Sequence, residues 1–454
     1  METTITLRSE IEAGITKLGM NFSAFSKHSG VNRGIFSAIL NGHPPKPISL
    51  NQFELIIRAL DCPEDWHFDL YIEECFYEGK PNRRRVEPFL IRCAELGRVD
   101  CIEEILNRLL EDLKHLEMIF EIAETLHSIG KVQESIIFYE CVALNEKYQH
   151  SEKLAISRYR LFCAAAGADA EKSLRAAIEF EPYCERLPTH HRLDGLMRLI
   201  NVYLSLDKKV EAERHSRELF NFSQLVYRQM EKALAKGTAE TWEGRYPFVV
   251  YYGYGFLSMQ NVMFFHRDYS KAKEYISGYA DLSNFPGLDA EGQKEVAKFS
   301  FFARENRLNL ELLAGNKGVL EECEDFIDQN PIELLVVLTF VLGSANRYGY
   351  SMDLLLSKFL PQIEIYDYEN SYYNQANSFN FYIEICYESA LYFLHRKEYE
   401  QALEYLLRGL KRIVKIKDKD AFIKFVPVFE KYKKWSSSVQ QMCYEEVIGG
   451  LSEV

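Results

Sequence analysis

The residues best suited to contact a ligand lie near the N-terminus, in and just after the stretch VNRGIFSAILNG. Arg33 carries a planar guanidinium that can donate two hydrogen bonds to one guanine. Asn32 and Ser37 offer short polar groups to a groove edge, and Asn41 and Lys46 offer donors to phosphate oxygens. These residue types suit contacts with double-stranded DNA.

Short helices must position these side chains. The apolar pattern predicts helices at 7–18, 21–28, 32–40, 49–60 and 63–76. Asn21 is placed to cap the second helix, Gly30 suits a left-handed turn after it, and SLNQ reads as a capping box that opens the fourth. The segment NGHPPKP separates the third helix from the fourth, since its prolines and glycine cannot continue a helix.

The helix NFSAFSKH, the turn SGV and the helix NRGIFSAILNG together predict a helix-turn-helix, whose second helix enters the major groove. This run resembles the Cro/repressor-type family over about 60 residues. Phe25 and Ser26 stand at that family's Leu-Ala positions, and Ser29 with the next two residues matches its turn. The close of the run, with Asn41 and Gly42, matches as well.

The resemblance also has departures. Phe22 replaces the glutamine that touches the DNA backbone in the family, and Gly34 and Ala38 stand where base-reading side chains usually are. Few side chains of this helix are therefore available to read base edges directly. We expect Gly34 to let the helix N-terminus lie close to DNA, so that shape is read as well as base edges. A helix-turn-helix-like bundle that has lost DNA binding is the alternative.

Charge is spread unevenly along the 454 residues, whose formal net charge is −13. Residues 1–60 hold six Lys or Arg against four acidic residues, so this segment is slightly basic and the remainder is strongly acidic. A protein that binds nucleic acid over its whole surface is excluded by this balance. A small basic module on a large acidic body fits it.

We expect a DNA-binding domain at 1–76, a linker at 77–88, and a helical domain at 89–454. The Arg83 to Arg85 run would either touch flanking phosphates or be a solvated part of the linker. Beyond it the chain reads as helical almost throughout, with breaks every 15 to 20 residues at SIGK, SLDKK, FHRDYS, LAGNK and LHRKEY. Paired helices in this rhythm predict an α-solenoid.

Three stretches fit tetratricopeptide spacing, in which small residues let paired helices approach and large ones fill the groove between them. The residues in that register are Ala390, Phe393, Ala402 and Leu406; Ala123, Leu126, Ser135 and Tyr139; and, as a poorer match, Ile200, Tyr203, Ala212 and Ser216. The predicted fold is thus all-α: a Cro/repressor-type helix-turn-helix bundle followed by a right-handed α-solenoid of degenerate tetratricopeptide-like repeats.

This layout resembles the RRNPP family of Gram-positive peptide-pheromone receptors. The weak repeats and the segment GRVDCIEEIL look most similar to the arbitrium receptors of phages and their bacterial relatives. The resemblance implies a homodimer that binds operator DNA and carries a short linear signalling peptide in the repeat groove. We place part of the dimer contact in the C-terminal helices, near QQMCYEEVIGGL, since a terminal repeat must be capped or covered.

An extended peptide exposes backbone donors and acceptors, which asparagine side chains can pair, and a terminal carboxylate, which a cation can bind. The repeat register selects Asn201 and Asn261 on the concave side, and family members use such inner-helix asparagines. Further candidates share an inner face by the same register or lie one turn apart on one helix: Arg304, Arg307, Asn377 and Asn380.

No catalytic constellation appears, and we expect neither an enzyme, a cofactor nor a metal site. The ten cysteines include no CxxC pair, which fits buried thiols in a reducing compartment. The pair His190-His191 lacks an HExxH context, and YGYGF lacks the glycine spacing of a nucleotide loop. No apolar run reaches about 18 residues and the first residues lack a signal-peptide layout, so we expect a cytoplasmic protein without membrane contact.

Two other functions remain open from the sequence. One is a repeat scaffold that inhibits or dephosphorylates a partner protein, as some members of the same family do without a DNA-binding domain. The other is a DNA-binding regulator whose repeats bind a protein or a small metabolite. A neighbouring short reading frame for a secreted propeptide would favour the peptide-responsive regulator.

Overall fold

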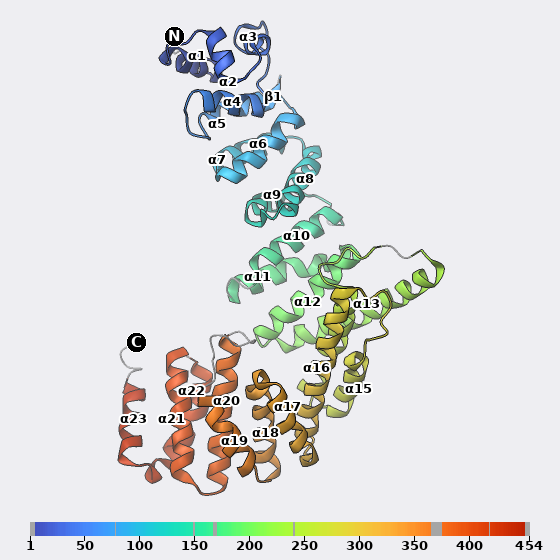
Figure 1. The fold of residues 1–454 in the computed structure, drawn as a ribbon, viewed down its shortest axis with the longest axis vertical. Helices are drawn as coiled ribbons and strands as arrows, with labels where there is room; N and C mark the ends of the chain where they lie inside the picture. Colours follow the sequence, from blue (N-terminus) through green and yellow to red (C-terminus); the bar gives the residue numbers. More distant parts are fainter. Residues whose placement is uncertain are drawn as a thin grey trace. The chain divides into compact units, whose positions relative to one another are not determined.

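The computed structural model of the chain describes residues 5–77, 79–148, 150–166, 170–238, 241–364, 375–416 and 418–449. Over these residues the chain forms twenty-three α-helices, five short 3-10 helices and one pair of two-residue strands (Figure 1). The fold class is therefore all-α, as the sequence predicts.

The chain divides into two compact units. The first comprises residues 1–215 and 243–245, and the second comprises residues 216–242 and 246–454. The helices of the first unit are α1 (Leu7–Lys17), α2 (Phe22–Ser29), α3 (Arg33–Asn41), α4 (Leu50–Ala59), α5 (Phe68–Cys75), α6 (Arg83–Leu96), α7 (Val99–Leu109), α8 (Leu116–Ser128), α9 (Val132–Asn145), α10 (Glu152–Ala165), α11 (Ala170–Phe180) and α12 (Thr189–Ser205).

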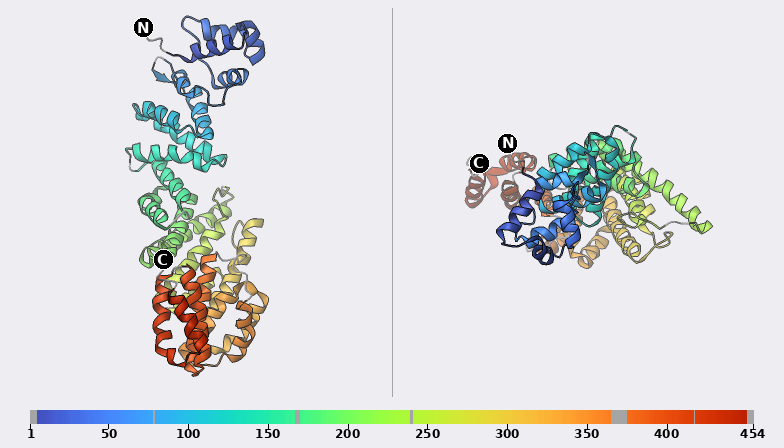
Figure 2. Two further views of the ribbon diagram at one scale, coloured as in Figure 1. Left: turned by 90° about the vertical axis from the view of Figure 1, so that its left-hand side faces the viewer. Right: turned by 90° about the horizontal axis from the view of Figure 1, so that it is seen from above.

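Helix α13 (Lys209–Lys236) begins in the first unit and continues into the second. The remaining helices are α14 (Phe248–Phe265), α15 (Tyr269–Ala280), α16 (Ala290–Leu313), α17 (Leu320–Gln329), α18 (Leu334–Tyr348), α19 (Asp353–Glu364), α20 (Gln375–His395), α21 (Tyr399–Ile416), α22 (Lys419–Tyr432) and α23 (Ser438–Gly449). Within the second unit, α20 packs on α21 and α21 on α22 and α23, so that these helices lie side by side (Figures 1 and 2).

The first five helices begin and end close to where the sequence predicts. Asn21 accepts a hydrogen bond from the backbone N–H of Ala24 and so caps α2, and Gly30 ends α2 with φ +74°. Ser49 and Gln52 form the predicted capping box at the start of α4. The fifth helix begins only at Phe68, later than predicted. Side-chain caps thus fix most of these boundaries.

The segment 77–88, expected as a linker, has regular secondary structure at most of the residues that the structure describes there, which are 77 and 79–88. Strand β1 (Phe76–Tyr77) pairs antiparallel with β2 (Lys80–Pro81), and α6 begins at Arg83. Arg83 bonds to Glu87 one turn later, at 3.0 Å, and also pairs with Glu121 of α8. Pro88 lies inside α6, so this proline does not end the helix.

The predicted breaks between helices coincide with residues in the left-handed backbone region. SIGK contains Gly130 (φ +83°), and LAGNK contains Gly315 (φ +84°). In the other three breaks the left-handed residue carries a side chain, namely Asp207, Arg267 and Lys397. A single left-handed residue ends each helix and turns the chain, which is a common way to terminate a helix.

The residues selected by tetratricopeptide spacing are all buried. They lie on the helix pairs α8 and α9, α12 and α13, and α20 and α21. Helix α8 packs on α9, and α20 packs on α21. The small residues Ala390 and Ala402, at 0% exposure, permit this approach.

One hydrophobic core runs through the first nine helices without interruption. It includes Leu7 of α1, Phe25 of α2, Tyr71 of α5, Phe89 of α6 and Val142 of α9. Helix α5 packs against both α6 and α7, and α4 packs against α6. The N-terminal five helices are therefore joined to the following helices by shared apolar packing.

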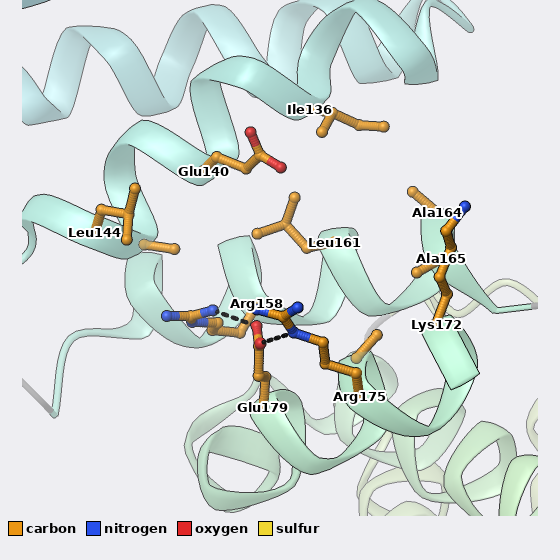
Figure 3. A pocket seen from close by; sticks show the side chains of 12 residues that line it. Ile136, Glu140, Leu144, Arg158, Leu161, Ala164, Ala165, Lys172, Arg175 and Glu179 are labelled. Carbon is orange, nitrogen blue, oxygen red and sulfur yellow. Dashed lines mark hydrogen bonds and ion pairs between the residues drawn. The ribbon is translucent and has the colours of Figure 1, made fainter. Parts of the chain in front are cut away.

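A groove of about 580 Å³ lies between α9, α10 and α11 in the first unit (Figure 3). Its apolar lining is provided largely by Ile136, Leu144, Leu161 and four alanines. At one side Glu179 lies between Arg158 and Arg175 and accepts hydrogen bonds from them at 3.0 and 3.1 Å. The groove thus has a small-residue floor and a charged rim.

Candidate functional site

Helix α3 presents a polar face to solvent because its apolar residues face inward. Phe36 and Ile39 are buried at 1% and 0% exposure, whereas Arg33, Ser37 and Asn41 are exposed. The turn before α3 is fixed by Ser26, whose hydroxyl donates to the carbonyl oxygen of Val31 at 2.6 Å. This geometry leaves the side chain of Arg33 without an ion-pair or hydrogen-bond partner among the described residues.

Asn32 has a local role that the sequence analysis did not assign. Its Oδ1 accepts hydrogen bonds from the backbone N–H groups of Gly34 at 2.8 Å and Ile35 at 3.4 Å, so Asn32 caps α3. The side-chain oxygen of Asn32 is therefore already hydrogen-bonded within the chain, although the residue is exposed. A Cβ at Gly34 would lie 3.3 Å from that Oδ1, so glycine also relieves crowding at the cap.

Lys46 is exposed on the segment between α3 and α4, and its backbone ties this segment to the protein. Its N–H donates to the carbonyl of Ala38 at 2.9 Å, and its carbonyl accepts from Arg8 Nη2 at 3.1 Å. All five residues proposed for DNA contact are therefore at the surface of one part of the first unit.

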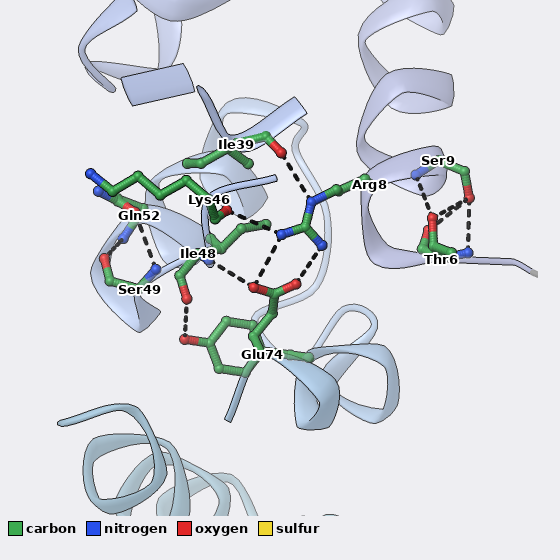
Figure 4. A network of polar contacts seen from close by, with 10 residues as sticks. Thr6, Arg8, Ser9, Ile39, Lys46, Ile48, Ser49, Gln52 and Glu74 are labelled. Carbon is green, nitrogen blue, oxygen red and sulfur yellow. Dashed lines mark hydrogen bonds and ion pairs between the residues drawn. The ribbon is translucent and has the colours of Figure 1, made fainter. Parts of the chain in front are cut away.

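A half-buried arginine holds the end of α3 in place (Figure 4). Arg8 Nε donates to the carbonyl of Ile39 at 3.0 Å, and Arg8 Nη1 donates to Glu74 Oε1 at 2.6 Å. Glu74 Oε2 accepts from the Ile48 N–H at 2.8 Å and from Arg8 Nη2 at 3.3 Å. This Arg8–Glu74 clasp joins α1, the end of α3, the following segment and α5.

The clasp continues into the aromatic packing between α5 and α6. Tyr71 donates from its hydroxyl to the carbonyl of Ile48 at 3.0 Å, and its ring lies 4.7 Å from that of Phe89 on α6. Phe68 lies 5.0 Å from the same ring. The sequence analysis missed Arg8, Glu74 and Tyr71 because nothing in local spacing links residues so far apart along the chain.

The two arginines predicted to bind a peptide carboxylate lie together, but both already meet an acidic side chain. Arg307 Nη2 is 2.5 Å from Glu322 Oε1 on α17, and Arg304 Nε is 3.8 Å from the same oxygen. Arg304 also donates to Gln329 at 3.3 Å and lies over the Phe326 ring. A ligand carboxylate here would have to compete with Glu322.

The predicted asparagines are distributed over three helices. Asn261 on α14 is half-buried and accepts from Gln260, at 3.4 Å. Asn201 is exposed on α12 in the first unit, and Asn380 is exposed on α20 in the second. Asn377 lies outside the residues whose side chains are described. The structure thus brings Arg304 and Arg307 together in the second unit, whereas Asn201 belongs to the first.

Buried polar residues of the second unit surround the middle of α16. The hydroxyl of Tyr279 donates to Gln260 Oε1 and accepts from Asn306 Nδ2 at 3.0 Å. Glu305 is 5% exposed, and burial, followed by the nearby Glu333 carboxylate, raises its pKa to about 8. A carboxyl group that stays protonated near neutral pH can donate a hydrogen bond.

In the first unit, a further network of largely buried polar side chains lies on α8, α10 and α12. Arg160 Nε pairs with Glu124 at 3.1 Å, and Asp194 accepts from the Tyr159 hydroxyl at 2.7 Å and pairs with Arg198. These carboxylates hold two arginines in fixed positions. Only the spacing of Asp194 and Arg198, four residues apart on one helix, could have indicated either pair from sequence.

His191 lies beside this group on α12. Burial, followed by the neighbouring His190 and Arg160, lowers the pKa of His191 to about 4. The imidazole is therefore neutral over the physiological range. In the part of the chain that the structure describes, no group of three or more His, Cys, Asp or Glu side chains is arranged to hold a metal ion.

Within the described ranges, no single helix combines the length and apolar content needed to cross a membrane. The bent pair Lys317–Gln329 and Pro331–Tyr348 meets that test only when its two members are taken together.

No protein-family model matches the chain, and no curated protein matches it in sequence. The class to which the fold assigns it is an all-α protein built as two compact helical units.

Proposed function

We propose that this chain is a peptide-responsive transcription regulator. In this proposal residues 1–76 form a Cro/repressor-type helix-turn-helix that binds operator DNA, and the later helices form a right-handed tetratricopeptide-like solenoid that binds a short linear peptide. The protein acts as a cytoplasmic homodimer, with the C-terminal helices forming part of the dimer contact. The resemblance to RRNPP receptors supports this reading.

The observation that carries the proposal is the exposed polar face of α3. The short helix α2 ends at Gly30 in the left-handed region, and α3 begins three residues later. Arg33 stands in the first turn of α3, exposed and without a partner among the described residues. An arginine at the start of a recognition helix can make a bidentate contact with guanine.

Substitution of Arg33 tests this role. Arg33→Ala should lose about 1–3 kcal/mol of discrimination at one G·C position. The operator is first selected from a random duplex library with the wild-type chain. The wild-type chain, Arg33→Ala and a control variant are then titrated with operator and scrambled duplexes at fixed salt. Arg84→Ala is the control, because Arg84 is exposed on α6 and lies outside α3.

The control variant should keep the wild-type ratio of operator to scrambled affinity. If Arg33→Ala keeps that ratio as well, Arg33 does not read a base, and the proposed recognition helix loses its main support.

A regulator whose repeats bind a protein remains the second candidate, favoured by the groove between α9 and α11. Alanines such as Ala143 and Ala176 allow a helix to approach closely, and Leu144 at its edge is 78% exposed. Apolar grooves with a charged rim are a common mode of helix recognition. Two results would favour this candidate. The chain would bind a protein partner and lose that binding on Leu144→Asp, and it would not bind short peptides.

A further inference from the structure

The C-terminal part of the acidic chain contains one strongly basic segment. Residues 408–434 hold ten Lys or Arg and only three acidic residues, a net charge of +7. Because the whole chain carries −13, the remainder carries −20. By comparison, residues 1–60 are only slightly basic, and Arg8 in that segment is paired with Glu74. The basic segment is thus the strongest positive feature of the sequence.

Packing of α21 and α22 directs several of these charges into solvent. Leu406 and Leu410 of α21 and Phe425 and Phe429 of α22 are buried in one core. Lys411 and Lys415, one turn apart on α21, and Lys419 in the first turn of α22 are exposed. Over the described residues, none of these three ammonium groups has an ion-pair or hydrogen-bond partner.

Two neighbouring cations of the same segment are neutralised locally. Lys424 pairs with Glu384 at 2.7 Å, and Arg408 pairs with Glu404 at 3.1 Å. The contrast defines a surface made by Lys411, Lys415 and Lys419, here called the lysine surface. Its positive charge is available to an external anion.

Helix stability does not account for the lysine surface. Like charges four residues apart, as at Lys411 and Lys415, destabilise a helix by a few tenths of a kcal/mol. Lys419 lies in the first turn of α22, where the helix dipole disfavours a cation. Lys415 lies in the last turn of α21, where the dipole favours a cation, so the three positions together give the local helices little net stabilisation.

The form of the surface indicates which kind of anion fits. A membrane-bound amphipathic helix keeps an apolar face for the lipid, but Phe425 and Phe429 of α22 are 0% exposed and belong to the core, and among the apolar side chains of this helix it is Ile423 that reaches 68% exposure. A tight protein–protein contact usually has buried anchor side chains in well-packed pockets near its centre. The cavity of about 500 Å³ in this part of the chain is lined by Glu398, Glu400 and Glu404 and is acidic.

Recognition of nucleic-acid phosphates needs neither a pocket nor an apolar face, because mobile surface cations release the counterions of the duplex. We propose that Lys411, Lys415 and Lys419 form a sequence-independent contact with the phosphate backbone of double-stranded DNA. This contact goes beyond the function proposed for α3 and does not require α3 to read bases.

A salt titration of the full chain tests the contact. The triple variant K411Q/K415Q/K419Q is compared with K147Q/K232Q/K236Q, which removes three exposed lysines elsewhere and so changes the net charge equally. Fluorescence anisotropy measures binding to a labelled random-sequence duplex over a series of salt concentrations, and circular dichroism checks that each variant is helical.

Each phosphate contact contributes about 0.9 to the slope of log K against log salt, so the slope should fall by about 2–3 in the first variant and stay at the wild-type value in the second. Equal slopes in the two variants would overturn the proposal. A parallel measurement uses phosphatidylserine vesicles and polyglutamate. Lysine-dependent binding to either of these, with no change in the DNA slope, would also overturn it.

The outcome is separable from that of the Arg33 experiment. If α3 does not read DNA, Arg33→Ala leaves the operator preference unchanged while the lysine variant still lowers the slope. If only the lysine surface is wrongly assigned, Arg33→Ala lowers the preference while both lysine variants keep the wild-type slope.

Discussion

Replacing Glu74 by glutamine should loosen the end of α3 without removing any group from the proposed DNA contact. The glutamate accepts hydrogen bonds from Arg8 through both oxygens and from the Ile48 N–H. Glutamine keeps one oxygen, so its NH2 group must face one of these donors. The Arg8 guanidinium, which also holds the carbonyls of Ile39 and Lys46, loses its counter-charge.

The size of the effect follows from burial. The Glu74 side chain is 6% exposed and that of Arg8 is 23% exposed. Breaking a buried pair by removal of one partner costs about 3–5 kcal/mol, and partial screening by solvent at Arg8 lowers this to about 2–4 kcal/mol. At about 1.4 kcal/mol for each factor of ten, local opening should become about 30- to 700-fold more frequent.

Hydrogen exchange measured by mass spectrometry suits this prediction, because a chain of two units need not unfold in one step. Amides at the end of α3 and in the segment up to Ile48 should lose protection, while those of the second unit should not change. Glu73→Gln is the matched control: Glu73 is 73% exposed and pairs with Arg108 at 2.8 Å, so its loss should cost less than about 1 kcal/mol.

Two results would contradict the reasoning. One is equal protection in Glu74→Gln and Glu73→Gln. The other concerns the double variant Arg8→Met with Glu74→Met, which removes both charges and should recover much of the lost protection. If the double variant is as unprotected as Glu74→Gln, the effect comes from packing at this site and not from an uncompensated charge.

Two further predictions concern the second unit. Burial, followed by Glu333, raises the pKa of Glu305 from 4.5 to about 8, so the folded state binds a proton that the unfolded state releases, and stability should fall as pH rises through this interval. Thermal unfolding at a series of pH values should show this decline in the wild type and a flatter profile in Glu305→Gln; identical profiles would mean that the carboxyl is not protonated in the fold. Glu322→Gln should free Arg304 and Arg307, so that a library-selected peptide with a free carboxyl terminus binds more tightly while its C-terminal amide is unaffected. Calorimetry that shows equal gains for acid and amide would remove the proposed role of these arginines.

Local signals in the sequence were sufficient for most helix boundaries. The cap at Asn21, the left-handed Gly30 and the capping box at Ser49 act over four residues or fewer, so the sequence contains all the information that they need. The breaks at Gly130 and Lys397 are local in the same sense. Burial of the repeat positions follows from periodicity along a single helix pair.

Longer-range features could not be predicted in this way. Arg8 and Glu74 are 66 residues apart, and no spacing rule selects this pair from the other charged residues. The sequence does not show that Arg307 is paired, because its partner Glu322 lies on the next helix. Whether the Glu322 side chain reaches Arg307 depends on how α16 and α17 pack. Pro88 lies within α6, and a proline in the sequence does not by itself show whether a helix continues through it.

The packing around α5 limits how a signal can reach α3 in the regulator that we propose. The core is continuous from Leu7 to Val142, and Glu74 on α5 reaches the arginine that holds Ile39 at the end of α3. A flexible linker would let the proposed DNA-binding helices move freely, but β1 pairs with β2 and α6 begins at Arg83. A displacement of the helices up to α9 would therefore move α3 with them. In a dimer such a motion changes the separation of the two recognition helices, so half-site spacing, more than the affinity of one α3, is the quantity on which a peptide would act.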